Sequence, residues 1–245
     1  MDRDVYDSMC KNEENHWWFS SRRLIIQKIL ERFVGTQSSS VLEVGCGSGG
    51  SLNMLSAYGE VSAMELDERA REAANSRGVC DVKKGRLPDD IPFENNFDLI
   101  CILDVLEHIE GDLAVIKALE KKLTPSGKLL ITVPAYQFLW SEHDVIHHHK
   151  RRYSRSQLEA LCLKSGLHVR YFSYFNTFLF PIILAIRLMS KVLKKSSGRG
   201  INKPSGFINK TLAKIFSSER FLLPQVTFPF GVSIILVAEK AEAPP

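Results

Sequence analysis

This sequence of 245 residues has no Cys-x-x-Cys pair, no recognisable signal segment and few acidic residues in its second half. The five cysteines are scattered, odd in number and contain no Cys-x-x-Cys pair, which argues against a disulfide framework. The N-terminus is acidic and polar and lacks a cationic, apolar signal segment, which argues against secretion. We therefore expect a cytoplasmic protein with reduced cysteines.

The scarcity of acidic residues divides the chain by charge. Residues 1–120 carry a net charge of −9, whereas residues 121–245 carry a net charge of +13. The basic half is therefore expected to meet an anionic substrate or surface. The overall composition, 44% hydrophobic and 24% charged, is typical of one folded domain with additions.

A turn with several glycines follows the first apolar run, residues 41–44. Glycine adopts backbone angles that other residues resist, and it lets a cofactor approach the main chain closely. Gly45, Gly47 and Gly50 have the spacing of the dinucleotide-binding fingerprint. The glycines alone are therefore also compatible with an enzyme that binds a nicotinamide or flavin cofactor.

Strand-like runs alternate with helix-like stretches over the first half of the chain. This alternation predicts a mostly parallel sheet with helices on both faces. In such sheets ligands bind beyond the carboxyl ends of the strands. The strand-like runs are 41–44, 61–65, 80–83, 97–102 and 128–133, and an amphipathic helix over 21–33 precedes them.

Two acidic features accompany the glycine turn: Glu43, and the segment Asp-Val-Leu-Glu-His-Ile at 104–109. Together the three resemble the class I S-adenosylmethionine (SAM) dependent methyltransferases. The resemblance implies an α/β, Rossmann-like fold with a seven-stranded, mostly parallel sheet, an antiparallel last strand, helices on both faces and a helical insertion between strands 6 and 7. It also implies four parts: an N-terminal helical lid (1–35), a SAM-binding core (36–175), a basic amphipathic helical insertion (176–225) and the final strand with a tail (226–245).

The resemblance makes SAM the cofactor and places its methionine part against the glycine turn. Glu43 is expected to face the amino group and Glu65 the ribose, a role for which Asp67 competes. Such methyltransferases often have an aspartate beside the adenine where this chain has Arg86, so we expect backbone groups and Leu87 to recognise the adenine. The expected SAM contacts are Glu43, Gly45, Cys46, Gly47, Gly49, Glu65, Leu66, Arg86, Leu87 and Asp104.

The methyl acceptor is expected at the same edge of the sheet. A hydroxyl acceptor must lose a proton to a general base, for which His108 and His143 are candidates, with Asp144 as an orienting partner. The expected substrate contacts come from the aromatic segment 16–19, from Tyr136 and from the basic loop that follows. They are Trp17, Trp18, Tyr136, His148, Arg151 and Arg152. Aromatic packing and a solvated basic loop are the plainer interpretations of these segments.

Three other functions stay open. Asp104, Glu107 and His108 are similar to a metal-binding element of ubiquinone-pathway O-methyltransferases and small-RNA 2′-O-methyltransferases, so a divalent-metal-assisted O-methyltransferase is one alternative. Because the same pattern occurs in related methyltransferases without a metal, we assign no metal ligand. An inactive SAM-binding scaffold that docks at membranes or partners is the second alternative, and a NAD-dependent oxidoreductase is the least favoured.

The insertion begins with a basic amphipathic segment, 181–195, in which Arg187, Lys191, Lys194 and Lys195 accompany a broad apolar face. It is too short and too charged to span a bilayer, which needs about 20 apolar residues. The segment predicts either peripheral contact with the anionic inner face of a membrane or a cap over the substrate pocket.

Several shorter motifs resemble a bacterial-type group within the type 11 and type 12 methyltransferases that is associated with surface polysaccharide and glycolipid pathways. They lie at 16–19, 140–144, 151–153 and 174–177. We therefore expect a small-molecule, glycan or lipid-linked acceptor that is methylated at oxygen. No RNA-binding motif favours a nucleic acid. The sequence leaves the acceptor and the oligomeric state undetermined.

Overall fold

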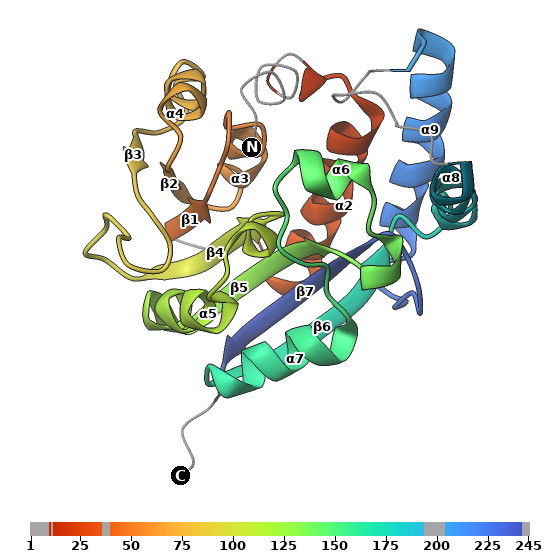
Figure 1. The fold of residues 1–245 in the computed structure, drawn as a ribbon. Helices are drawn as coiled ribbons and strands as arrows, with labels where there is room; N and C mark the ends of the chain where they lie inside the picture. The colour runs from red at the N-terminus through yellow and green to blue at the C-terminus, as the bar shows by residue number, and fades with distance from the viewer. Residues whose placement is uncertain (1–9, 11, 36–39, 194–203, 242–245) are drawn as a thin grey trace.

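The centre of the protein is a seven-stranded sheet with the strand order β3-β2-β1-β4-β5-β7-β6 (Figure 1). The structure is a computed structural model that describes residues 10, 12–35, 40–193 and 204–241. The strands are β1 (Ser40–Val44), β2 (Glu60–Glu65), β3 (Val82–Lys84), β4 (Phe97–Leu103), β5 (Leu123–Pro134), β6 (Leu167–Phe175) and β7 (Ser233–Lys240).

The first five strands are parallel. In the middle of the sheet, Val41 of β1 lies opposite Val61 of β2 and Leu99 of β4. β4 pairs in turn with β5, where Ile102 lies opposite Ile131. β7 is antiparallel to both of its neighbours, β5 and β6. The expected Rossmann-like sheet with an antiparallel last strand is confirmed.

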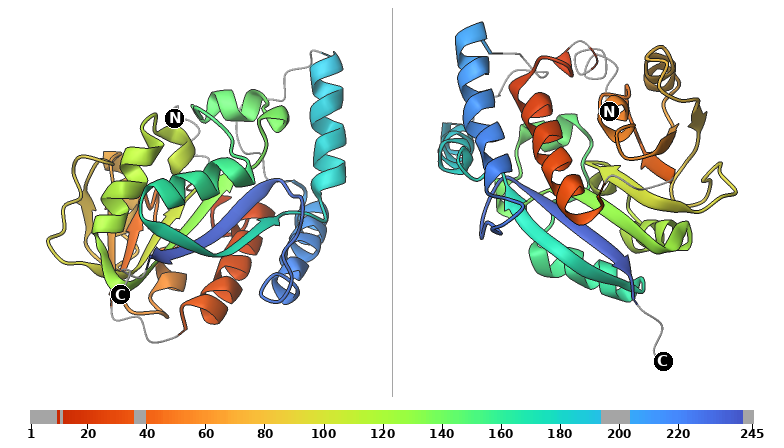
Figure 2. Two further views of the ribbon diagram at one scale, coloured as in Figure 1. Left: turned by 90° about the horizontal axis from the view of Figure 1, so that it is seen from below. Right: turned by 180° about the vertical axis from the view of Figure 1, so that it is seen from behind.

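Helices cover both faces of this sheet (Figure 2). One face carries α5 (Asp112–Lys121) and α7 (Arg155–Lys164), and the other carries α2 (Trp17–Phe33) and α9 (Gly206–Ser218). Because both faces are covered, β1 and β4 are apolar along most of their length instead of alternating. Glu43, in the middle of β1, is a buried exception.

The remaining helices are short or lie at the rim of the sheet. They are α3 (Leu52–Leu55), α4 (Glu68–Asn75), α6 (Glu142–Ile146) and α8 (Phe180–Leu193), with the 3-10 turns η1 (Leu106–His108), η2 (Gln137–Leu139) and η3 (Glu219–Phe221). No helix in the described ranges has the length and apolar content needed to cross a membrane.

Helix α2 begins one turn earlier than the predicted start at residue 21. The backbone N–H of Trp18 donates a hydrogen bond to the His16 side chain at 3.2 Å, which satisfies one of the free donors at the helix start. Further along, Ile25, Ile26 and Ile29 are fully buried against the sheet. The aromatic segment therefore belongs to the helix and does not precede it.

Helix α9 lies alongside α2, although almost 200 residues separate them in sequence. The side-chain oxygen of Asn209 accepts the backbone N–H of Trp17 at 2.9 Å, and its nitrogen donates to the carbonyl of Asn15 at 2.9 Å. Phe216 of α9 is fully buried and contacts the Trp17 ring edge to face. The insertion thus packs directly against the N-terminal helix.

Helix α8 forms where the basic amphipathic helix is predicted, but its one described cation points inward. The guanidinium of Arg187 donates to the carbonyl of Leu139 and lies 4.0 Å from a carboxylate oxygen of Asp144. This corrects the expected basic outer face at this position. The side chain of Lys191, and both Lys194 and Lys195, lie outside the described residues.

One carboxylate links the segment before α8 to the turn that follows α9. Glu219 is fully buried, and its oxygens accept the backbone N–H groups of Asn176 at 2.7 Å, Thr177 at 2.6 Å and Phe178 at 2.8 Å. Burial raises the pKa of Glu219 to about 7, while these three donors act to lower it. The contact connects the two ends of the insertion and holds α8 at the edge of the sheet.

Glu219→Gln is therefore expected to destabilise the protein, because an amide offers one acceptor oxygen and adds two donors that face other donors. We expect a loss of about 1–3 kcal/mol in the free energy of unfolding, measured by urea denaturation. Glu159→Gln, at a largely surface position on α7, is the matched control and should change stability little. Equal stability of the two variants would contradict the structural role of Glu219.

Candidate functional site

A large cavity of about 1470 Å³ lies at the carboxyl ends of β1, β2, β4 and β5. Ligand pockets for one small molecule usually measure about 300–1,000 Å³. The cavity therefore has room for a cofactor together with a second ligand. Its walls come from the glycine turn, the ends of the strands, α2, the histidine-rich loop around α6, and α8.

The glycine turn after β1 needs glycine for two reasons. Gly45, Gly47 and Gly49 have φ angles of +67°, +56° and +80°, a left-handed region that strains other residues. A Cβ atom on Gly45 would come within 2.7 Å of Val105, whereas one on Gly47 would meet nothing within 4 Å. The turn thus brings bare backbone to the cavity at Gly47, and Gly49 faces the protein interior instead.

Glu65, at the end of β2, holds the turn in place. One of its oxygens accepts the N–H of Gly47 at 2.8 Å, and the other accepts the N–H of Asp67 at 2.9 Å. The Asp67 side chain instead accepts the N–H of Ala70 and caps α4. Both acids line the cavity, and Glu65 is the one that contacts the glycine turn.

The neighbouring part of the cavity can receive a flat apolar group. Leu66 is half exposed there although it is a large hydrophobic residue, and the buried Leu87 lines the same cavity. Arg86 is exposed and lines the same region. All expected SAM contacts except Gly49 therefore line this one cavity.

Glu43 presents an unusual buried acid to the cavity. Its residue is 3% exposed, and its Oε2 atom has no hydrogen-bond partner among the described residues. Burial raises the pKa of Glu43 to about 8, and Arg22 opposes that rise. A buried carboxyl group without a full partner is costly. A cationic ligand beside it would remove this cost.

Arg22 of α2 is a cavity residue that the sequence did not single out. Its guanidinium donates to Thr132 of β5 at 3.1 Å and pairs with the Asp104 carboxylate at 2.5 Å. Its Nε atom is buried and makes no hydrogen bond within the described part of the chain. Asp104 has a φ angle of +55°, which turns its side chain back toward this cation. These residues are distant in sequence, and only the fold brings them together. The sequence pattern therefore indicates only that Arg22 belongs to an amphipathic helix.

The N-terminal segment lies against the glycine turn. The Glu13 carboxylate accepts from the Ser48 hydroxyl and from the N–H of Gly50 at 3.1 Å, and pairs with Arg77 at 3.1 Å. Trp17 and Trp18 follow it and line the cavity, where the Arg22 guanidinium stacks 5.1 Å from the Trp18 ring.

The histidine-rich loop is built around the buried carboxylate of Asp144. Arg152 Nε donates to it at 2.7 Å, His149 Nδ1 lies 2.9 Å away, and the N–H of Ser141 donates at 2.8 Å. Burial alone would raise the pKa of Asp144, but these contacts lower the pKa below its usual range. Asp144 does not line the cavity, and it positions its neighbours instead of reaching a ligand.

His147 is a second residue that the sequence analysis left out of its candidate set. Its Nδ1 atom lies 2.7 Å from the His143 carbonyl, which can only accept, so Nδ1 carries the proton. The other nitrogen, Nε2, is then an acceptor, and it is buried in the cavity wall without a partner in the described ranges. Burial lowers the pKa of His147. The His143 ring, with its centroid 3.9 Å away, lines the same wall.

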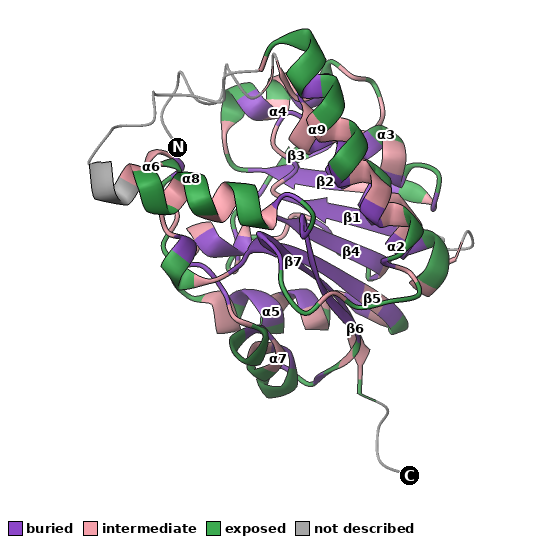
Figure 3. Ribbon diagram, turned by 90° about the vertical axis from the view of Figure 1, so that its right-hand side faces the viewer, coloured by how far each residue is buried: buried purple, intermediate pink, exposed green. Residues whose placement is uncertain are grey.

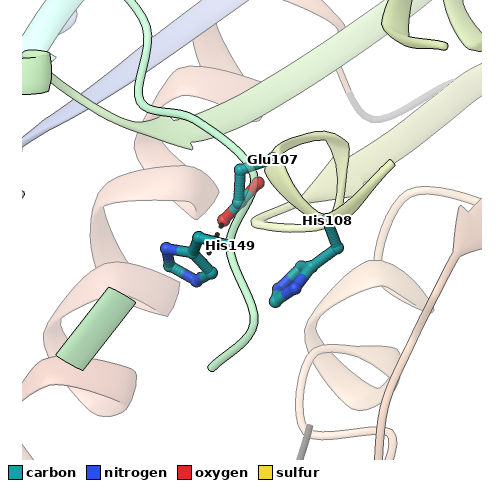
Figure 4. A group of neighbouring side chains, drawn as sticks. All are labelled: Glu107, His108 and His149. Carbon is teal, nitrogen blue, oxygen red and sulfur yellow. Dashed lines mark ion pairs between the residues drawn. The ribbon is translucent and has the colours of Figure 1, made fainter. Parts of the chain in front are cut away.

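Glu107, His108 and His149 form a separate group in the same cavity (Figure 4). One ligand atom from each lies within 4.8 Å of the other two, and His149 Nε2 is 4.0 Å from Glu107 Oε1. Glu107 is fully buried, and neither carboxylate oxygen accepts a hydrogen bond from a described residue. Asp104, which the metal-assisted alternative groups with Glu107 and His108, pairs with Arg22 instead, and His149 completes the group.

Three of the expected substrate contacts lie away from the cavity lining. Tyr136 stacks on Tyr174 with ring centroids 4.9 Å apart, and Arg151 pairs with Asp112 at 2.8 Å. His148 is exposed on the outer side of the loop. Arg152 does line the cavity, although its guanidinium is committed to Asp144.

The glycine turn, the acid after β2 and the strand order define a nucleotide-cofactor enzyme of the Rossmann-like class. A family model for the methyltransferase domain matches residues 18–171, so the chain belongs to that family. Its cofactor is SAM.

Similar proteins agree with this assignment at low identity. A Mycolicibacterium smegmatis protein named as an S-adenosylmethionine-dependent methyltransferase is 24% identical over 49% of this chain and 47% of its own length. A ubiquinone biosynthesis O-methyltransferase of Hydrogenovibrio crunogenus is 24% identical over 64% of this chain and 76% of its own. The matched part thus spans about half the length of the first relative.

Solved structures show the same fold. The plantazolicin methyltransferase, solved with a monoazolic analogue and S-adenosylhomocysteine (SAH), has a TM-score of 0.61 at 13% identity, with 98% of this chain and 91% of that chain covered.

The raised pKa of Glu43 predicts a proton linked to SAM binding. At pH 7, below its pKa of about 8, Glu43 is mostly protonated. The SAM ammonium favours the ionised form, so binding should release about one proton and affinity should rise as pH approaches 8. Calorimetry in buffers of different ionisation enthalpy measures that release. The variant Glu43→Gln is the control, because it still reports protons released by SAM itself. Equal proton release by the variant and the wild type would contradict the role of Glu43.

Proposed function

We propose that this protein is a SAM-dependent methyltransferase that methylates an oxygen atom of a small-molecule, glycan or lipid-linked acceptor. The observation that carries the proposal is that one cavity is lined by two groups of polar residues. We call Glu43, Glu65 and the glycine turn the first region of this lining, and the histidine-rich loop the second region. Helix α8 also lines the cavity, through Ile183, Ile186, Arg187 and Ser190.

The first region suits the charges of SAM. The unpartnered Oε2 of Glu43 would accept the amino group, and the free Nε of Arg22 would donate to the carboxylate of the methionine part. The Glu65 carboxylate, which accepts the N–H of Gly47, would also accept hydrogen bonds from the ribose hydroxyls. Leu66 and Leu87 would enclose the adenine. These contacts hold the sulfonium in a fixed direction, and alignment of donor and acceptor contributes about 7–11 kcal/mol to such displacements.

The second region supplies a base for a hydroxyl acceptor. Bound SAM would supply the methyl group, with its carbon–sulfur bond exchanged for a carbon–oxygen bond to the acceptor and neutral SAH as the leaving group. The proton of the acceptor hydroxyl passes to Nε2 of His147, which is the unprotonated nitrogen of that ring. His143 and His108 line the same region and would surround the acceptor oxygen. The relative named as an O-methyltransferase supports oxygen as the target.

His147→Gln should lower kcat by about 10²- to 10⁴-fold and leave SAM affinity unchanged. His168→Gln, on the exposed part of β6, is the matched control. The assay uses labelled SAM with lipid and small-molecule fractions of a cell extract. The label should resist mild alkaline hydrolysis, as an ether methyl does.

Because burial lowers the pKa of His147, the acidic limb of the kcat profile should lie below about pH 6.5. An undiminished kcat in the variant would remove His147 as the base. SAM binding without transfer to any fraction would instead support an inactive scaffold.

A second candidate function is a metal-assisted version of the same transfer. Glu107, His108 and His149 offer one carboxylate and two imidazoles, a set that suits zinc or ferrous iron. The free oxygens of the buried Glu107 fit a cation. The Asp144 carboxylate contacts Nδ1 of His149, as carboxylates commonly do behind a metal-bound histidine, and this leaves Nε2 for an ion. A bound ion would lower the pKa of an acceptor hydroxyl.

If this group holds a metal, the purified protein should contain about one divalent ion per chain. Elemental analysis by mass spectrometry measures it, and thermal unfolding with and without a chelator gives an independent readout. His108→Gln should lose the ion and its thermal stabilisation, whereas His168→Gln should keep both. Equal metal content in these two variants, or none in the wild type, rejects the candidate.

A further inference from the structure

We infer that α8 and α9 seat this protein on an anionic lipid bilayer, so that an amphiphilic acceptor reaches the cavity along α8. The inference rests on the proposed transfer to such an acceptor and adds the surface that delivers it. Figure 3 shows both helices on one side of the molecule, with exposed residues along each.

Helix α8 is apolar on a surface that the rest of the protein leaves uncovered. None of residues 180–190 is buried. Ile182, Leu188 and Met189 are at least half exposed, with Met189 at 60%. Water makes such a surface costly, and contiguous apolar patches usually mark contact with a partner or a membrane.

Helix α9 adds an apolar and cationic surface on the same side. Phe207 is 82% exposed and Ile208 is 51% exposed, next to the exposed side chains of Lys210 and Lys214. The opposite side of the helix carries Asn209 and Phe216, which are buried against α2. The exposed side is therefore not needed for the fold.

The charge pattern selects an anionic bilayer as the occupant. Residues 180–218 contain eight lysines and arginines and no aspartate or glutamate. One of the eight, Arg187, is withdrawn into the cavity wall. The exposed apolar side chains beside Lys210 and Lys214, in a stretch of sequence without acids, match a membrane interface, where apolar groups enter the headgroup boundary and cations attract anionic lipids.

The same helix connects this surface to the cavity. Ile183, Arg187 and Ser190 recur at helical spacing and line the cavity, while Ile182 and Met189 face outward. Ile186 is exposed and also lines the cavity, which places it at the mouth. A lipid chain that lies along the outer side of α8 thus reaches the histidine-rich loop without crossing water.

The test is co-sedimentation with vesicles of phosphatidylcholine alone and of phosphatidylcholine mixed with phosphatidylglycerol. The wild type should sediment with the mixed vesicles only, and less so at high salt. The double variant Ile182→Glu and Met189→Glu should lower the partition coefficient at least about tenfold, because it removes apolar contact and adds repulsion. Leu163→Glu on α7, also exposed at 76%, is the matched control and should bind as the wild type does.

Three results would overturn the inference: equal sedimentation with both vesicle types, no sedimentation with either, or equal binding by the α8 variant and the wild type. A change of oligomeric state in the α8 variant with unchanged vesicle binding would assign the surface to a second copy of the chain instead. Calorimetry with SAM on the same variants separates the two proposals. If the wild type binds SAM but no vesicles, only the membrane docking is rejected. If the wild type does not bind SAM, the proposed function is rejected.

Discussion

The ion pair between the buried Arg22 and the partly buried Asp104 is the interaction on which the site depends. It joins α2 to the ends of β4 and β5, and it places one cation among the acids Glu43, Asp104 and Glu107. Charges interact strongly where water is excluded. Burial raises the pKa values of Glu43 and Glu107, and a positively charged ligand would let these carboxyl groups ionise, so this part of the cavity favours such a ligand. A sulfonium cofactor with an ammonium group is such a ligand, and its carboxylate can use the free Nε of Arg22.

Both halves of the chain, which differ in charge, line the cavity. Residues 1–120 supply the glycine turn, Glu43 and Glu65 together with Glu107 and His108, and residues 121–245 supply the histidine-rich loop and α8. Asp144 organises that loop by satisfying Arg152 and His149 at once. Burial lowers the pKa values of His143 and His147, so the loop holds neutral imidazoles close together, which suits either proton transfer or metal binding.

Much of the fold could be predicted from the sequence because its signals are local. The strand runs, the turn glycines and the amphipathic helices appear within a few residues of their predicted bounds. The antiparallel last strand followed from the resemblance, which describes a complete sheet. Arg22 and His147 could not be selected in this way, because their importance lies in partners that are distant in sequence or in one nitrogen left without a partner.

The sequence by itself determined the class of fold, the cofactor turn and the acids that line it, since strand period, glycine spacing and the positions of Glu43 and Glu65 are properties of short segments. Only the tertiary structure decided which side chains meet. It turned Arg187 into the cavity wall, paired Asp104 with Arg22, and brought His149 beside Glu107. The reason is physical: buried charges settle where partners from other elements satisfy them, and no local pattern encodes those partners.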